Sequence, residues 1–173
     1  NGSVSYFGQK DYSLARNKWL YVKNNQWYYL GLNGNLKTGW QTIDSKTYYF
    51  DSNGLMQTGW KRLDSKWYYF GSANDGAMKT YWQNINNTYY FLGSDGIMRT
   101  GWQKIWGKWY YLNSSGAMKT GWQRINSIWY YFGSASDGAM KTYWQKVNNV
   151  YYFLGSDGAM RTGWQSIWGK WYY

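Results

Sequence analysis

A tryptophan recurs at nearly constant spacing and divides most of the chain into similar short units. It is preceded by Gly or Tyr and followed by Gln or Lys at Trp40, Trp60, Trp82, Trp102, Trp122, Trp144 and Trp164, in steps of 20 or 22 residues. Trp19 begins a looser first unit 21 residues before Trp40. Such repetition is typical of arrays in which each unit packs on its neighbours, which excludes most folds built around a single core.

A longer period overlies the first one. Tryptophans 62 residues apart, such as Trp40 and Trp102, occupy equivalent positions, and the segments 89–111 and 151–173 differ at only two positions. Three consecutive units therefore form a larger unit. A solenoid that completes one turn every three units explains this period, and a recent duplication of a triplet explains it equally well.

Each unit has the pattern of a β-hairpin. A stretch of the type Gly-Trp-Gln-x-Ile is followed by a short polar turn and then by Trp-Tyr-Tyr-Phe, as in residues 59–70. Aromatic and β-branched residues bounded by Gly, Asn, Asp and Ser are typical of strands and tight turns. Since no segment sustains a 3.6-residue period, we expect an all-β chain of tandem hairpins of about 20 residues, with essentially no helix.

Strand alternation divides the aromatic residues between two faces of each hairpin. In the unit 59–70, Tyr68 and Phe70 share the face that we expect to form the core, whereas Trp60, Trp67 and Tyr69 share a more exposed face. Isolated hairpins are marginal in water, so neighbouring units must stack to bury the inner faces. Every unit then also presents an aromatic surface.

The composition excludes much catalytic and metal chemistry. The chain of 173 residues has no Cys, His or Pro, and its eight acidic residues are all Asp. Nucleophile–imidazole systems and His/Cys zinc sites therefore lack their side chains, and no pair of Asp residues stands out as an acid and a base. No apolar run approaches the roughly 20 residues of a membrane-spanning helix. We expect neither an enzyme nor a metal or other cofactor.

The aromatic residues and the positive charge narrow the classes of partner. Aromatics make up 24% of the chain and the formal net charge is +11. Aromatic residues on hairpins often serve only cross-strand packing, but two large aromatic faces per unit exceed what one core requires. Exposed rings suit sugars or quaternary ammonium groups, and the basic residues suit a polyanion. Nucleic acid is disfavoured, because the chain carries no nucleic-acid-binding motif.

The repeated motif, Gly-Trp followed by Trp-Tyr-Tyr-Phe and then by Gly-x-Met-x-Thr, resembles the choline-binding repeat of surface proteins and phage lysins from pneumococci and related streptococci. The resemblance covers residues 19–173 in about eight copies. It implies a left-handed superhelix of hairpins with about three per turn. It also implies choline sites between successive hairpins, each built from the two Trp of one repeat and a Tyr of the next, with a loop Met lining the cavity.

Carried onto this sequence, the family pattern predicts three complete sites and one weaker site. The complete sites are Trp60, Trp67, Tyr90 and Met78; Trp102, Trp109, Tyr131 and Met118; and Trp122, Trp129, Tyr152 and Met140. The weaker site is Trp19, Trp27 and Tyr49, where Leu36 replaces the Met.

Other repeats depart from the family pattern. Thr47, Thr88 and Val150 are taken to occupy the position of the second Trp, so the sites that begin at Trp40, Trp82 and Trp144 are expected to lack a wall. The units that begin at Trp82 and Trp144 are also expected to be one residue shorter between their strands. Trp164 and Trp171 form half a site.

The resemblance predicts a non-catalytic module that attaches a secreted or surface protein to phosphocholine on teichoic and lipoteichoic acids of a Gram-positive cell wall. Choline is the expected ligand, without a cofactor, nucleic acid or membrane span. A homodimer through terminal repeats stays open. One alternative is a carbohydrate-binding repeat of the glucan or toxin type, and another is a structural or adhesin rod. Residues 1–18 are interpreted as an N-terminal segment that is the remnant of a preceding hairpin. This segment does not indicate whether another domain was attached.

Overall fold

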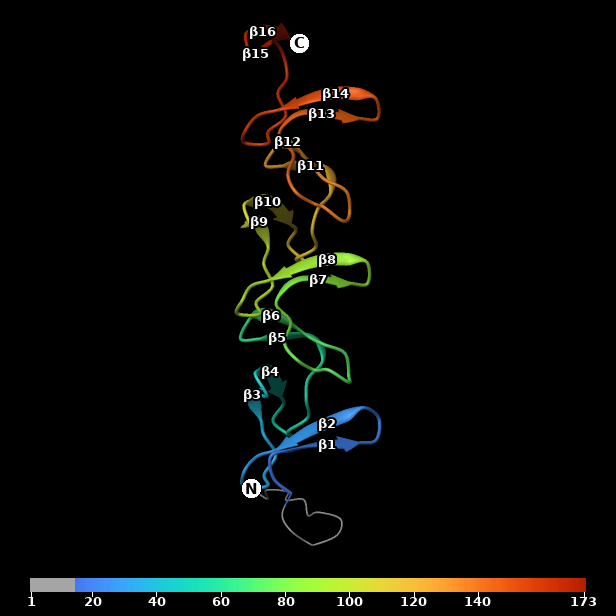
Figure 1. The fold of residues 1–173 in the computed structure, drawn as a ribbon, viewed down its shortest axis with the longest axis vertical. Helices are drawn as coiled ribbons and strands as arrows, with labels where there is room; N and C mark the ends of the chain where they lie inside the picture. The colour runs from blue at the N-terminus through green and yellow to red at the C-terminus, as the bar shows by residue number, and fades with distance from the viewer. Residues whose placement is uncertain (1–14) are drawn as a thin grey trace. The chain divides into compact units, whose positions relative to one another are not determined.

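The computed structural model describes residues 15–173, and within them it contains sixteen β-strands and no helix (Figure 1). These residues fall into two compact units, 15–83 with 92–98 and 84–91 with 99–173, and the boundary passes through one hairpin. The prediction of an all-β chain of tandem hairpins is confirmed. The interpretation of residues 1–18 as a hairpin remnant concerns mainly residues outside the described part, and it stays a prediction.

The strands form eight hairpins in chain order. They are β1 (Lys18–Val22) with β2 (Gln26–Leu30), β3 (Gly39–Ile43) with β4 (Lys46–Phe50), β5 (Gly59–Leu63) with β6 (Lys66–Phe70), β7 (Tyr81–Ile85) with β8 (Thr88–Leu92), β9 (Gly101–Ile105) with β10 (Lys108–Leu112), β11 (Gly121–Ile125) with β12 (Ile128–Phe132), β13 (Tyr143–Val147) with β14 (Val150–Leu154), and β15 (Gln165–Ile167) with β16 (Lys170–Tyr172). Among the described strands, each pairs only with the other strand of its own hairpin.

Two-residue turns with left-handed backbone close the hairpins. Asp44 and Ser45 have φ angles of 48° and 63°, and Asn126 and Ser127 have φ angles of 48° and 67°. Positive φ at both central residues matches the right-handed twist of the flanking strands, and Asn, Asp and Gly tolerate it best. The turn residues therefore fix the register, which places Trp102 opposite Tyr111 and Lys104 opposite Trp109.

The buried side chains of each hairpin follow the predicted alternation. The last residue of the second strand is fully buried in most hairpins; these residues are Leu30, Phe50, Phe70, Leu92, Leu112, Phe132 and Leu154. On the opposite face Trp67 is 42% exposed, and Trp109 and Trp129 are each 41% exposed. One face of every such hairpin is thus buried while the tryptophan face stays open to solvent.

The loops connect each hairpin to the one before it. The backbone N–H of Met56, which follows β4, donates to the carbonyl of Trp27 in β2 at 2.8 Å, and Met140 after β12 donates to Trp109 in β10 at 2.7 Å. Successive loops of the second unit also stack: a Cβ added to Gly138 would overlap the Met118 thioether, and one added to Gly158 would overlap Met140. These contacts join hairpins that share no sheet.

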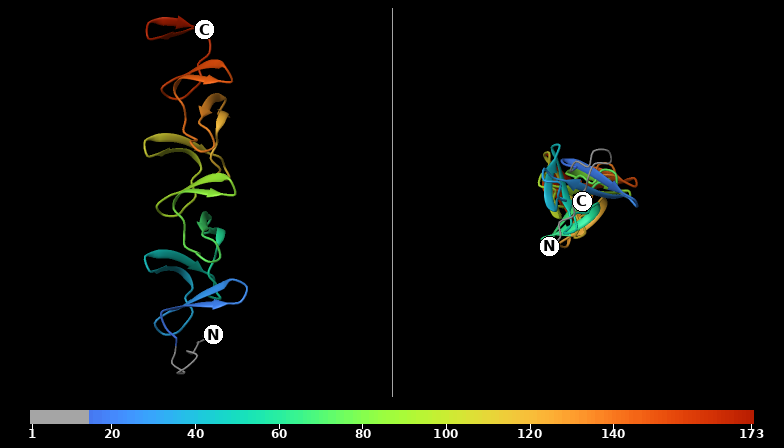
Figure 2. Two further views of the ribbon diagram at one scale, coloured as in Figure 1. Left: turned by 45° about the vertical axis from the view of Figure 1, so that its right-hand side comes forward. Right: turned by 90° about the horizontal axis from the view of Figure 1, so that it is seen from below.

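The second unit shows the longer period in three dimensions. Its hairpins β9–β10 and β15–β16, three hairpins apart, point in the same direction (Figure 2, left). This agrees with a period of three repeats inside that unit. The left-handed superhelix stays a prediction.

Ion pairs hold the longer loops. Lys141 pairs with Asp137 and Lys79 pairs with Asp75, each four residues apart, and Arg161 Nη2 lies 2.8 Å from Asp157 Oδ1. The side-chain hydrogen bond from Lys141 keeps the pKa of Asp137 below its ordinary value of 3.8, against the opposing effect of burial. The loop that follows β12 is therefore tied to its own C-terminal end.

We predict that Gly138→Ala destabilises the protein by about 2–3 kcal/mol, because it combines a left-handed φ of 59° with displacement of the Met118 side chain. Gly121→Ala is the matched control, since Gly121 has a φ of 64° but open space around the added Cβ, and it should cost only about 1 kcal/mol. Denaturant unfolding of both variants checks the difference. Equal losses would show that the stacking of Met118 on Gly138 contributes nothing.

We also predict that Lys141→Gln lowers stability by about 0.5 kcal/mol at pH 7 and not at pH 2, the modest size reflecting an ion pair about one-third exposed. The pKa of Asp137 is depressed in the folded state, so its contribution is present above the unfolded pKa and is lost as the pH falls through the folded pKa. Lys119→Gln, at the equivalent position of a loop in which Ser115 replaces the aspartate, is the control. An equal loss at both pH values would contradict the prediction.

Candidate functional site

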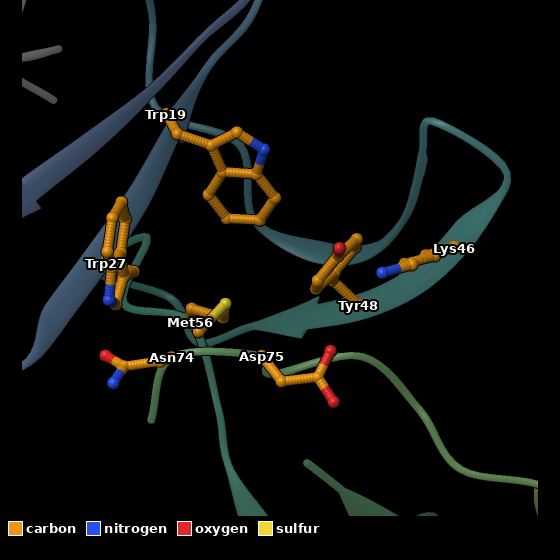
Figure 3. A pocket seen from close by; sticks show the side chains of 7 residues that line it. All are labelled: Trp19, Trp27, Lys46, Tyr48, Met56, Asn74 and Asp75. Carbon is orange, nitrogen blue, oxygen red and sulfur yellow. The ribbon is translucent and has the colours of Figure 1, made fainter. Parts of the chain in front are cut away.

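Each unit contains an aromatic cavity of the same design. In the first unit a cavity of about 410 Å³ is lined by Trp19, Trp27, Lys46, Tyr48, Met56, Asn74 and Asp75 (Figure 3). In the second unit a cavity of about 320 Å³ is lined by Trp102, Trp109, Tyr130, Met140, Ser156 and Asp157. Both therefore contain two Trp, one Tyr, one Met and a pair of polar residues that includes an Asp, and the first cavity also contains Lys46.

Three rings form the walls of each cavity. In the first, the centroid of the Trp19 ring lies 6.3 Å from that of Trp27 with the planes at 83°, and 4.9 Å from that of Tyr48 at 67°. In the second, the corresponding values for Trp102 are 6.3 Å and 86° to Trp109, and 4.9 Å and 70° to Tyr130. Rings set nearly at right angles leave an open corner with π-faces on more than one side (Figure 3).

Each wall comes from a defined element. The two Trp lie on the two strands of one hairpin and on the same face of it. Trp102 and Lys104, two residues apart on β9, share this face, and so does Trp109, which lies opposite Lys104 on β10. The Tyr comes from the second strand of the next hairpin. The Met comes from the loop that follows this next hairpin, where its N–H bonds to the carbonyl of the second Trp.

The structure corrects which Tyr completes two of the predicted sites. The cavity walls are Tyr48 and Tyr130, and not the predicted Tyr49 and Tyr131. Tyr49 pairs across its own hairpin with Trp40, at 5.2 Å, and Tyr131 pairs likewise with Trp122, at 5.0 Å. The second Tyr of the pair thus shares a face with the Trp of its own hairpin, and the first Tyr points to the preceding hairpin.

The predicted Met residues are wrong by one repeat. Met140, and not Met118, lines the cavity of Trp102, and Met56, rather than the predicted Leu36, lines the cavity of Trp19. The loop of a hairpin lies beside the site of the preceding repeat, since its Met bonds to that repeat's second strand. The site at Trp19 therefore has a Met wall.

The site at Trp122 follows the same plan. Its ring lies 6.3 Å from Trp129 and 4.8 Å from the predicted Tyr152, and Met160 rather than Met140 donates to the Trp129 carbonyl. Tyr152 is the positional equivalent of Tyr130, since each lies opposite a Gln of its own hairpin.

For the site at Trp60, the first unit holds Trp60 and Trp67, 6.4 Å apart at 86°. Met98 donates to the Trp67 carbonyl, whereas the predicted Met78 donates to that of Thr47. The predicted Tyr90 belongs to the second unit.

The structure revises the repeats that were expected to lack a wall. Thr47 does occupy the position of the second Trp, opposite Thr42. Val150 does not: Tyr151 lies opposite Lys146, as Trp129 lies opposite Arg124, and both hairpins have two-residue turns. Similarly Tyr89, and not Thr88, accepts the hydrogen bond from the next loop's Met. The one-residue shortening inferred from the sequence is therefore wrong, and these repeats carry Tyr at the second wall.

Acidic side chains lie near the cavities and act on a wall Tyr. Among residues 15–173 no group of three or more His, Cys, Asp or Glu side chains lies close enough to hold a metal ion. Burial, followed by the negative charges of Asp75 and Asp44, raises the pKa of the Tyr48 hydroxyl above its ordinary value of 10.0. No helix among these residues could cross a membrane.

Comparison with known families supports this arrangement. A model described as "Choline-binding repeat" matches residues 37–81, 79–120 and 119–160, and one described as "Putative cell wall binding repeat" matches residues 17–36. A search of proteins with curated descriptions found no match.

Solved structures from Streptococcus pneumoniae are similar over most of the chain. CbpJ of strain TIGR4 is 45% identical over 91% of this chain and 56% of its own, with a TM-score of 0.83. Choline binding protein F, solved with a peptidoglycan analogue, is 39% identical over 88% and 54%, with a TM-score of 0.79. The modular autolysin LytC, solved with a synthetic peptidoglycan ligand, is 29% identical over 100% and 40%, with a TM-score of 0.68.

The chain thus spans little more than half the length of the first two of these relatives. The family matches cover most of its residues, and an aromatic cavity lies in each of the two compact units. The chain belongs to the choline-binding repeat family.

Proposed function

We propose that the chain is a non-catalytic module that binds choline and attaches a secreted protein to phosphocholine on the teichoic and lipoteichoic acids of a Gram-positive cell wall. The observation that carries the proposal is the pair of three-ring cavities, one in each unit, with matched walls. A quaternary ammonium group cannot donate a hydrogen bond, so rings and van der Waals contact are the means of recognising it.

The chemistry of the cavities suits this ligand. A cation against the faces of desolvated aromatic rings gains about 0.5–2 kcal/mol per favourable ring contact. The flexible, polarisable Met at the base can adapt to three methyl groups. Trp109 stays 41% exposed at the cavity of the second unit, so a choline that is esterified to a polymer can enter with its phosphate left in water.

Several weak sites on one array favour a polymeric ligand. Once one choline of a teichoic chain is bound, the others reach the remaining cavities at a high effective concentration. The net charge of +11 also attracts the phosphates of such a polymer. The similarity to an autolysin and to choline-binding proteins of pneumococcus supports attachment to the cell wall.

We expect calorimetric titration to show saturable binding of choline and of tetramethylammonium, and no heat from glucose oligomers. The reason is that the cavities present ring faces and a carboxylate rather than the many hydrogen-bonding groups that sugars require. Binding of the glucose oligomers alone would place the chain among carbohydrate-binding repeats and overturn the proposal.

We predict that Trp109→Ala weakens choline binding at the Trp102 site at least tenfold, because it removes one of three walls. The Nε1–H resonance of Trp102 in an NMR titration reports this site alone. Trp168→Ala, which removes a turn residue 78% exposed and outside that cavity, should leave the affinity unchanged. Equal effects of the two variants would count against the cavity as the binding site.

A further inference from the structure

Both cavities carry a carboxylate that an aromatic cage does not need. Asp75 lines the cavity of Trp19 and Trp27, and Asp157 lines the cavity of Trp102 and Trp109. Each belongs to the loop after the second following hairpin, so three consecutive repeats contribute to one site. The sequence explains these Asp residues only as turn formers before Gly.

We propose that Asp157 and Asp75 are specificity-determining residues, each a negatively charged fourth wall that selects a quaternary ammonium cation over a neutral molecule of the same shape. This inference rests on the proposed choline binding. It adds to the rings a charge that acts on the ligand's own charge.

The loops hold these carboxylates at the cavity edge. Figure 3 shows Asp75 and Asn74 opposite Trp19, with Met56 between them and Tyr48 to one side. The backbone N–H of Asp75 donates to the Ser72 carbonyl at 2.9 Å, and Asp157 Oδ1 accepts from the Ala159 N–H at 3.1 Å. The first bond fixes the backbone of Asp75, whose carboxylate pairs with Lys79, and the second fixes the carboxylate of Asp157 itself.

The same loop position carries an Asp beside other wall tyrosines. Burial and then the charge of Asp95 raise the pKa of Tyr68, and burial and then the charge of Asp137 raise that of Tyr110. Tyr68 and Tyr110 are the counterparts of Tyr48 and Tyr130 in their hairpins. The carboxylate thus recurs with the wall Tyr in both units.

The overall charge of the protein makes a local negative group useful. With a net charge of +11, the surface as a whole repels a small cation. A carboxylate at the cavity offsets this repulsion at the binding site. Its attraction to the ammonium group strengthens as the distance between the two charges falls and as water is excluded.

A basic residue moderates each carboxylate. Arg161 Nη2 donates to both oxygens of Asp157, at 2.8 and 2.9 Å, and Lys79 pairs with Asp75. The Asp157 side chain nevertheless stays 58% exposed, so a bound cation can share it. Because Arg161 competes for the carboxylate, its removal must strengthen cation binding if the charge acts on the ligand.

Two variants of opposite expected sign test the inference. NMR titrations of the whole chain at low salt follow the Nε1–H resonances of Trp102 and Trp109 with choline and with 3,3-dimethylbutan-1-ol, its neutral carbon analogue. Asp157→Asn should weaken choline binding about threefold to tenfold and leave the alcohol unchanged, and Arg161→Gln should strengthen choline binding about twofold. Asp64→Asn, in the turn between β5 and β6, is the control, because Asp64 does not line this cavity.

A purely structural role for Asp157 gives a different pattern. Losing the loop geometry would weaken choline and the alcohol together, and Arg161→Gln would then also weaken both; either result overturns the inference. If the wild-type chain binds choline and Asp157→Asn binds it equally well, the inference fails while the proposed function stands. If the wild-type chain does not bind choline at all, the proposed function fails and this inference fails with it.

Discussion

The structure depends on a two-stranded hairpin being unable to bury its own apolar face. Each described hairpin lacks a third strand, and in most of them the last residue, such as Phe132, becomes fully buried only through neighbouring repeats. The hydrogen bond from each loop Met to the carbonyl of the preceding second wall, as from Met140 to Trp109, fixes how neighbours meet. The cavity forms at the same junction, so the contacts that stabilise the array also shape the candidate site.

This coupling explains why the same residue types serve both folding and binding. Tyr130 packs on the Trp102 ring at 4.9 Å and also lines the cavity. Met140 bonds through its backbone, supports Gly158 of the next loop and presents its side chain to the same cavity. Aromatic rings and a thioether can both pack between repeats and line the cavity, because neither needs a hydrogen-bond partner on the ligand.

The sequence predicts the hairpins correctly, but it does not predict which residues meet where successive hairpins contact each other. Period and alternation predicted buried Phe70 and exposed Trp67, because both properties belong to a single strand. The choice of Tyr130 over Tyr131, and of Met140 over Met118, depends on which neighbour each face meets, and this follows from the loop path. Val150 is wrongly predicted at the second wall because its strand carries Tyr151 where others carry Trp; the constant two-residue turn is the signal that identifies Tyr151. The carboxylate of Asp157 comes from the second following repeat, beyond the reach of a motif confined to one unit.

A site assembled from three consecutive repeats has a consequence for how such an array changes in evolution. Duplicating a single hairpin creates new neighbours on both sides and can mismatch a wall or a carboxylate. Copying a triplet restores every neighbour relation except at its edges. Segments 89–111 and 151–173, three repeats apart, are nearly identical, as the duplication of a triplet would leave them. Such a duplication adds cavities and preserves the contacts between neighbouring repeats.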